Sequence, residues 1–137
     1  MTDVFSPEKR SVVMASIRGQ NTKPEIRVRS ILHRLGFRFR LHRSDLPGTP
    51  DIVLSRYTAV IMVHGCFWHQ HKGCAEGRLP RSRLDFWEPK LRKNVERDAR
   101  NVHDLHELGW RAMIVWECQL KDESQLQMRL VHELKHG

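Results

Sequence analysis

Hydrophobic positions spaced three or four residues apart predict four helices in this chain. The predicted helices cover residues 7–18, 22–35, 89–108 and 122–134. Ser6 precedes a proline, which is typical of a helix start, and Thr22 with Glu25 forms a capping box. The residues of the third helix that we expect to face inward are Leu91, Val95, Val102 and Leu105.

Two other patterns predict strands. Residues 37–41 alternate between apolar and basic side chains, which is typical of a half-buried strand. Residues 51–55 and 58–63 are short apolar runs that we interpret as paired central strands, and residues 110–116 form a buried strand. The order of helices and strands predicts a single α/β domain over residues 1–137, with a mixed sheet flanked by helices.

Composition narrows the possible classes of protein. Hydrophobic residues make up 39% of the 137 residues and charged residues 29%, which excludes a disordered chain. The longest apolar run, Ala59 to Val63, is too short to cross a membrane. The first residues lack the basic and apolar segments of a secretory signal, so we expect a cytoplasmic protein without a membrane partner.

The formal net charge of +8 is unevenly distributed. Residues 1–45 carry a net charge of +6 and residues 78–100 carry +4, while residues 46–77 between them are neutral. A basic domain can simply be soluble, but two basic segments around a neutral centre favour a groove that follows phosphates. DNA or RNA is therefore the first candidate partner.

Cysteine and histidine gather in the segment that follows the central strands. Cys66, His71 and Cys74 lie close together in the sequence, and Cys118 follows the last predicted strand. Thiolates and imidazoles are the preferred ligands of structural Zn²⁺, so these four residues are a candidate Cys₃His site. The alternative is three buried free thiols with solvent-exposed histidines.

A second group of residues suits phosphate chemistry. Asp51 opens a predicted strand, Glu25 lies in the first turn of a helix, and His64 and His69 follow the next strand. Carboxylates can hold Mg²⁺ and an imidazole can move a proton. Glu25 could serve only as a cap and Asp51 only as a turn residue. Together, in a basic protein, the four favour a metal-dependent phosphodiesterase.

Several sequence strings resemble one family, the very-short-patch-repair mismatch endonucleases, or Vsr-type DNA-nicking enzymes. Two strings are specific: Gly-Cys-Phe-Trp-His at residues 65–69 and Asn-Val-Glu-Arg-Asp at residues 94–98. The other matching segments are Met14, Thr22-Lys23-Pro24-Glu25, Leu46-Pro47-Gly48-Thr49-Pro50-Asp51, Phe86-Trp87 and residues 108–118. The match covers nearly the whole chain.

The resemblance implies a restriction-endonuclease-like fold and a bacterial, nucleoid-associated enzyme. Its implied reaction is Mg²⁺-dependent hydrolysis of one DNA strand next to the thymine of a T·G mismatch, which arises when 5-methylcytosine deaminates. The implied partner is duplex DNA with such a mismatch, and mismatch-repair proteins are further candidates. We expect the enzyme to be a monomer.

The resemblance also assigns roles to individual residues. Asp51 and the backbone carbonyl of Val63 would bind Mg²⁺, while Glu25 and His64 would hold metal-bound waters. His69, oriented by Asp98, would be the acid–base group at the scissile phosphate. The implied zinc ligands are Cys66, His71, Cys74 and Cys118. The implied DNA contacts are Phe67, Trp68 and Trp87, which wedge into the duplex, and Met14 in an N-terminal arm of residues 1–21.

The chain departs from the family pattern at two positions. Gly73 adds a residue between two of the zinc ligands, and Val63 replaces the usual threonine before the His-Gly pair. Two other hypotheses also stay open. One is a related restriction- or defence-type endonuclease with another target, and the other is a zinc-stabilised DNA-binding module without catalysis.

Overall fold

The computed structural model describes residues 21–136. The predicted helix over residues 7–18, Met14 and nearly all of the predicted N-terminal arm lie outside these described residues.

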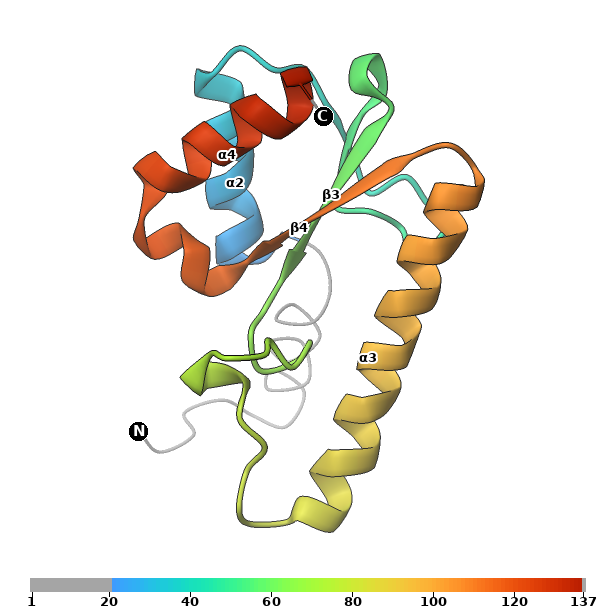
Figure 1. Cartoon of the computed structure of the whole chain (residues 1–137), viewed down its shortest axis with the longest axis vertical. Helices are drawn as coiled ribbons and strands as arrows, with labels where there is room; N and C mark the ends of the chain where they lie inside the picture. The colour runs from blue at the N-terminus through green and yellow to red at the C-terminus, as the bar shows by residue number, and fades with distance from the viewer. Residues whose placement is uncertain (1–20, 137) are drawn as a thin grey trace.

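A four-stranded mixed sheet runs through the centre of the fold (Figure 1). Its strands lie in the order β1 (Arg40–Leu41), β2 (Ile52–Leu54), β3 (Ala59–His64) and β4 (Arg111–Trp116). The β1–β2 and β2–β3 pairs are antiparallel, whereas β3 and β4 are parallel. The predicted pairing of the two central apolar runs is therefore confirmed.

Helices cover both faces of this sheet. Figure 1 shows α2 (Lys23–Arg34) and α4 (Glu123–His136) on one face and the long α3 (Leu84–Glu107) on the other. Three 3₁₀ helices, η1 (Ser55–Tyr57), η2 (Ala75–Gly77) and η3 (Glu117–Lys121), lie in the connections. The α/β architecture predicted from the sequence is confirmed. No helix within residues 21–136 combines the length and apolar character needed to cross a membrane.

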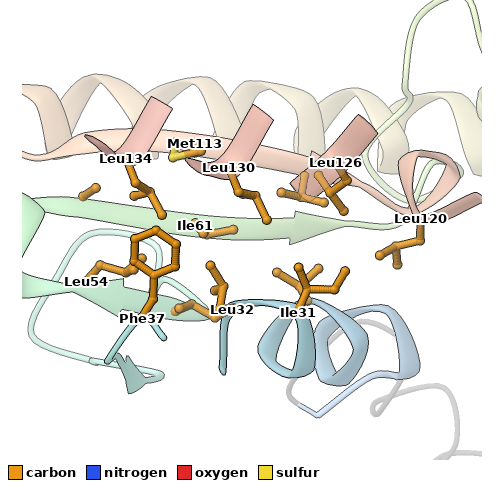
Figure 2. Packing of buried hydrophobic residues seen from close by; sticks show 14 residues of the cluster. Ile31, Leu32, Phe37, Leu54, Ile61, Met113, Leu120, Leu126, Leu130 and Leu134 are labelled. Carbon is orange, nitrogen blue, oxygen red and sulfur yellow. The ribbon is translucent and has the colours of Figure 1, made fainter. Parts of the chain in front are cut away.

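The larger hydrophobic core lies between the sheet and helices α2 and α4 (Figure 2). Figure 2 shows leucines of α4 meeting Ile31 and Leu32 of α2 around Ile61 of β3. The buried residues of this core that Figure 2 labels are Ile31, Leu32, Phe37, Leu54, Ile61, Met113, Leu120, Leu126, Leu130 and Leu134. This core fixes α2, and with it Glu25, against the sheet.

A smaller core lies under α3, where Val53, Val60 and Met62 meet Leu105 of the helix. Successive side chains of a strand point to opposite faces, so Ala59 and Ile61 belong to the larger core. His64 lies two residues after Met62 and four after Val60, so its side chain points to the same face of the sheet, the one covered by α3.

One edge strand of the described sheet is β4, and side chains of neighbouring elements bind two of its backbone groups. The N–H of Trp116 donates to Gln119 Oε1 at 3.0 Å. Arg129 of α4 donates to the carbonyl oxygen of Ile114 at 2.9 Å. The same guanidinium also donates to Gln119 Oε1 at 3.0 Å, so the two capping side chains support each other.

Two predicted boundaries differ from the structure. The strand predicted over residues 37–41 is reduced to β1, because the partner strand β2 is only three residues long and supplies pairs for just two residues. The helix predicted from Pro89 begins five residues earlier, at Leu84, with the proline inside it. A proline removes only one helical hydrogen bond, and the helix continues across it.

The prediction that Val95 faces inward is wrong, since its exposed fraction is 40%. Leu91 and Leu105 are fully buried as expected, and Val102 is partly buried against the smaller core. Figure 1 shows the N-terminal half of α3 extending beyond the sheet, beside the segment that follows β3.

Candidate active site

Three segments bring together Glu25, His42 and Asp51. Glu25 lies in the first turn of α2, His42 directly follows β1, and Asp51 directly precedes β2. One potential ligand atom from each residue lies within 4.8 Å of the other two. This group is well shielded from solvent, since the Glu25 side chain is only 1% exposed and that of His42 is 13% exposed.

Hydrogen bonds fix this group firmly. Asp51 Oδ2 accepts the N–H of Val63 at 2.8 Å, which ties the start of β2 to the end of β3. His42 Nε2 lies 2.8 Å from Glu25 Oε2, and the Arg29 guanidinium donates to the same oxygen. Glu25 Oε1 accepts the N–H of Asn21, while the Glu25 N–H donates to the Thr22 hydroxyl that caps α2.

The carboxyl group of Asp51 is held in an unfavourable environment for a charge. Burial raises its pKa to about 7, an effect that the hydrogen bond from Val63 only partly opposes and that the nearby Glu25 carboxylate increases. A buried pair of carboxylates gains most from a cation that neutralises both. The donors of Glu25 and Asp51 are oxygens, which are the ligands that Mg²⁺ prefers.

A second group consists of His64, His69 and Asp98, from β3, the following loop and α3. The rings of His64 and His69 stack with centroids 3.7 Å apart, and His69 Nδ1 lies 2.6 Å from Asp98 Oδ2. Burial and the adjacent His69 lower the pKa of His64 to about 4, so its ring is neutral near pH 7. Within residues 21–136, His64 Nδ1 is a buried atom without a hydrogen-bond partner.

The two groups adjoin each other through consecutive residues of β3. Val63 binds the carboxylate of Asp51, and the next residue, His64, stacks on His69. Asp51 directly precedes β2 and His64 ends the adjacent strand β3, although the two residues belong to different groups. The backbone N–H of Val63 contacts Asp51, and the proposed role of its carbonyl in metal binding stays a prediction.

The four candidate zinc ligands lie together. Ligand atoms of Cys66, His71, Cys74 and Cys118 all lie within 4.8 Å of one another. His71 Nδ1 is 3.7 Å from the sulfur of Cys66 and 3.4 Å from that of Cys118. In a tetrahedral zinc site, sulfur and nitrogen ligands lie about 3.5 Å apart. The donor set and its spacing thus fit a structural Zn²⁺.

Burial disfavours charged thiolates in this cluster, and a bound cation would favour them. Burial raises the pKa of Cys66 to about 12, and burial also raises the pKa of Cys118. The extra Gly73 adopts a left-handed conformation with φ of 76°, and a Cβ there would contact nothing within 4 Å. It lengthens the loop outward, and Cys74 still reaches the cluster.

An aromatic group lies where the loop meets the start of α3. The ring centroids of Phe67, Trp68 and Trp87 are 5.2 to 5.8 Å apart, in edge-to-face arrangements. Asn94 of α3 donates to the backbone carbonyl of Trp68 at 3.2 Å, which fixes the loop on the helix. All three rings are partly exposed and belong to neither of the two hydrophobic cores.

Sequence reasoning missed three residues of this region. His42 and Arg29 both contact Glu25, and neither belongs to a recognisable motif. Trp116 ends the strand that the sequence predicts to be buried. Instead its indole stacks on His71 at 4.1 Å and meets His64 edge-on at 5.2 Å, so it separates the Cys/His cluster from the His64 group.

Among solved structures, the catalytic domain of the homing endonuclease I-Bth0305I shares this fold. The two structures superpose with a TM-score of 0.58, covering 82% of this chain and 93% of the other, at 21% identity. This likeness supports the predicted restriction-endonuclease-like arrangement of a mixed sheet between helices.

Sequence comparison gives closer relatives. The chain is 55% identical to the type II nicking enzyme V.XorIIP of Xanthomonas oryzae pv. oryzae, covering 95% of each chain. It is 45% identical to the DNA mismatch endonuclease Vsr of Escherichia coli, covering 92% of this chain and 80% of the other. The protein is therefore a DNA endonuclease, as predicted. The sequence model described as DNA mismatch endonuclease Vsr matches residues 2–76, more than half of the chain, and the chain belongs to that family.

Proposed function

We propose that this protein is a Mg²⁺-dependent endonuclease that nicks one DNA strand next to the thymine of a T·G mismatch. One observation carries the proposal: the Glu25–Asp51 carboxylates and the His69–Asp98 pair adjoin at the end of β3. A cation site beside an oriented imidazole is the arrangement that phosphodiester hydrolysis requires. The names of the relatives, a mismatch endonuclease and a nicking enzyme, support the same reaction.

In this proposal Asp51 and the carbonyl of Val63 bind the cation, and Glu25 and His64 hold its waters. Such an ion, when bound, would activate a water and neutralise charge on the phosphate. The neutral His64 ring, whose pKa burial lowers to about 4, can hold a water by hydrogen bonding without adding positive charge. This explains why a histidine there is compatible with a nearby divalent cation.

His69 is the proposed acid–base group. Asp98 Oδ2, 2.6 Å from Nδ1, fixes the ring orientation and favours a proton on that nitrogen. Nε2 is then available to accept or donate a proton at the scissile phosphate. Asp98 therefore acts through His69, as a positioning residue.

Phe67, Trp68 and Trp87 are the proposed wedge that enters the duplex, joined by Met14 from the N-terminal arm. Inserting aromatic rings between bases requires unstacking, which costs less where pairing is already faulty. Preference for a mismatch would then arise partly from deformability of the DNA. Cys66, His71, Cys74 and Cys118 are the proposed ligands of a structural Zn²⁺ that holds the loop carrying Phe67 and Trp68.

The decisive experiment compares labelled duplexes that differ only in one T·G pair, with Mg²⁺ present or omitted. We expect one strand of the T·G duplex to be cut, and only with Mg²⁺. Asp51→Asn should abolish cleavage, whereas Asp104→Asn, an exposed aspartate of α3, should not. Cleavage of matched DNA would instead support a restriction- or defence-type enzyme, and binding without cleavage an inactive module.

A further inference from the structure

His42 contacts the carboxylates of the proposed cation site from a strained backbone position. Its φ is 49°, in the left-handed region that non-glycine residues rarely adopt. The N–H of His42 donates to the carbonyl oxygen of Asp51 at 3.2 Å, which holds the strained residue against the strand. Strain of this kind costs free energy and concentrates at functional sites, where surrounding contacts enforce it.

The ring of His42 points at the carboxylate of Glu25. His42 Nε2 is 2.8 Å from Glu25 Oε2, and a ring nitrogen of His42 lies within 4.8 Å of a carboxylate oxygen of Asp51. Neighbouring ligands of an octahedral cation with bonds of about 2.1 Å lie about 3 Å apart. The imidazole nitrogen therefore has the spacing of an inner ligand beside Glu25, whose carboxylate, also bound by Arg29, would reach the same ion through a water.

We propose that His42 supplies a nitrogen ligand to the divalent cation of this site; the inference rests on the proposed function. An imidazole binds metals as a neutral group. A third carboxylate at this position would add negative charge beside Glu25 and Asp51, whose oxygens already lie within 4.8 Å of each other and of His42. A neutral nitrogen donor strengthens cation binding without that cost.

A nitrogen ligand also changes which cation the site prefers. Mg²⁺ favours oxygen ligands, whereas Mn²⁺, which also accepts oxygen ligands, is a first-row transition metal that binds an imidazole nitrogen more readily than Mg²⁺ does. The mixed Glu25–His42–Asp51 set should therefore bind Mn²⁺ more tightly than Mg²⁺. A hydrogen bond from His42 to Glu25 alone would instead affect both cations equally.

The test is Mn²⁺ binding to the full-length protein, first loaded with one equivalent of Zn²⁺ so that the Cys/His cluster is filled. Pulsed electron paramagnetic resonance detects a ¹⁴N nucleus bonded to Mn²⁺, and calorimetry gives the affinities for Mn²⁺ and Mg²⁺. We expect ¹⁴N coupling in the wild type and its loss in His42→Gln. The variant should bind Mn²⁺ about tenfold more weakly or worse, with a smaller loss for Mg²⁺.

Matched variants separate the possible outcomes. His33→Gln, an exposed histidine of α2, should leave coupling and affinities unchanged. Coupling that persists in His42→Gln and disappears in His69→Gln would assign the nitrogen to the other group and overturn the inference. Equal losses for Mn²⁺ and Mg²⁺ without ¹⁴N coupling would overturn it too. Tight Mn²⁺ binding by Asp51→Asn would instead contradict the proposed function, because it would show that the cation does not bind at Asp51.

Discussion

Replacing Asp51 by asparagine should stabilise the cation-free protein while it removes cleavage. The pKa of the Asp51 carboxyl is about 7 in the folded protein and about 3.9 in an unfolded chain. Ionising this buried group therefore costs up to about 4 kcal/mol of folding free energy at pH above 7. Asparagine keeps an oxygen that can accept the N–H of Val63, and it is never ionised.

The pH dependence follows from the sign of this shift. Below about pH 4 the Asp51 carboxyl is protonated in both the folded and the unfolded chain, so its ionisation does not change the stability of the wild type relative to the variant. The folded wild type then loses stability as pH rises toward about 7, because only the unfolded chain ionises easily. Above about pH 7 the difference is constant, and after a discount for imperfect asparagine packing we expect about 2 to 4 kcal/mol.

Denaturant unfolding at several pH values measures this difference, with Zn²⁺ present and Mg²⁺ absent. Near neutral pH the variant should melt roughly 6 to 12 °C higher. Mg²⁺ should stabilise the wild type alone, because only the wild type has both carboxylates. Asp104→Asn is the control for the chemical change and should be neutral. A variant less stable than wild type at pH 8, or a pH-independent difference, would refute the reasoning about burial.

Three further perturbations address the other parts of the molecule. Asp98→Asn should slow single-turnover cleavage by about 10² to 10⁴, with DNA affinity kept, because His69 loses its orienting carboxylate. Cys118→Ser should lower the zinc content measured by metal analysis and also the melting temperature, because it removes one of four ligands. Leu130→Ala should cost about 3 kcal/mol in urea unfolding, because its side chain is fully buried between the sheet and α2.

Each of these has an outcome that contradicts it. Wild-type cleavage by Asp98→Asn would mean that His69 needs no carboxylate partner. Unchanged zinc content and melting temperature in Cys118→Ser would exclude that sulfur as a ligand. Met128→Ala is the control for the core variant, since Met128 of α4 is 68% exposed and should be nearly neutral. Equal costs at both positions would contradict the packing described for α4.

The sequence predicted those features that depend on short-range patterns. Capping by Thr22, the two short apolar runs that form the central strands, and the Cys/His spacing are all local signals, and each agrees with the structure. Element boundaries were less predictable: α3 crosses Pro89, and β1 is limited by the length of β2. Those outcomes depend on partners that are distant in the sequence.

Residues that act through tertiary contacts were not predictable in the same way. His42 ends an alternating apolar and polar segment, and only the pairing of β1 with β2 places it beside Asp51 and Glu25. Its occurrence just before a Pro-Gly turn and Asp51 was the one available signal. The contacts of Trp116 were also hidden from sequence analysis. Its neighbours are His64, at the end of β3, and His71, in the loop that follows β3, and both are more than 40 residues away in the sequence.

The capping of β4 by Gln119 and Arg129 has a consequence for how copies of the protein behave in a crowded cell. An uncovered edge strand is a template on which another chain can add its own strand, and this is a common start of aggregation. Here the outward N–H of Trp116 and the outward carbonyl of Ile114 already have partners within the same chain. An incoming strand would have to displace a guanidinium and an amide that also bind each other. Two polar side chains thus obstruct the addition of a strand at this edge of the sheet.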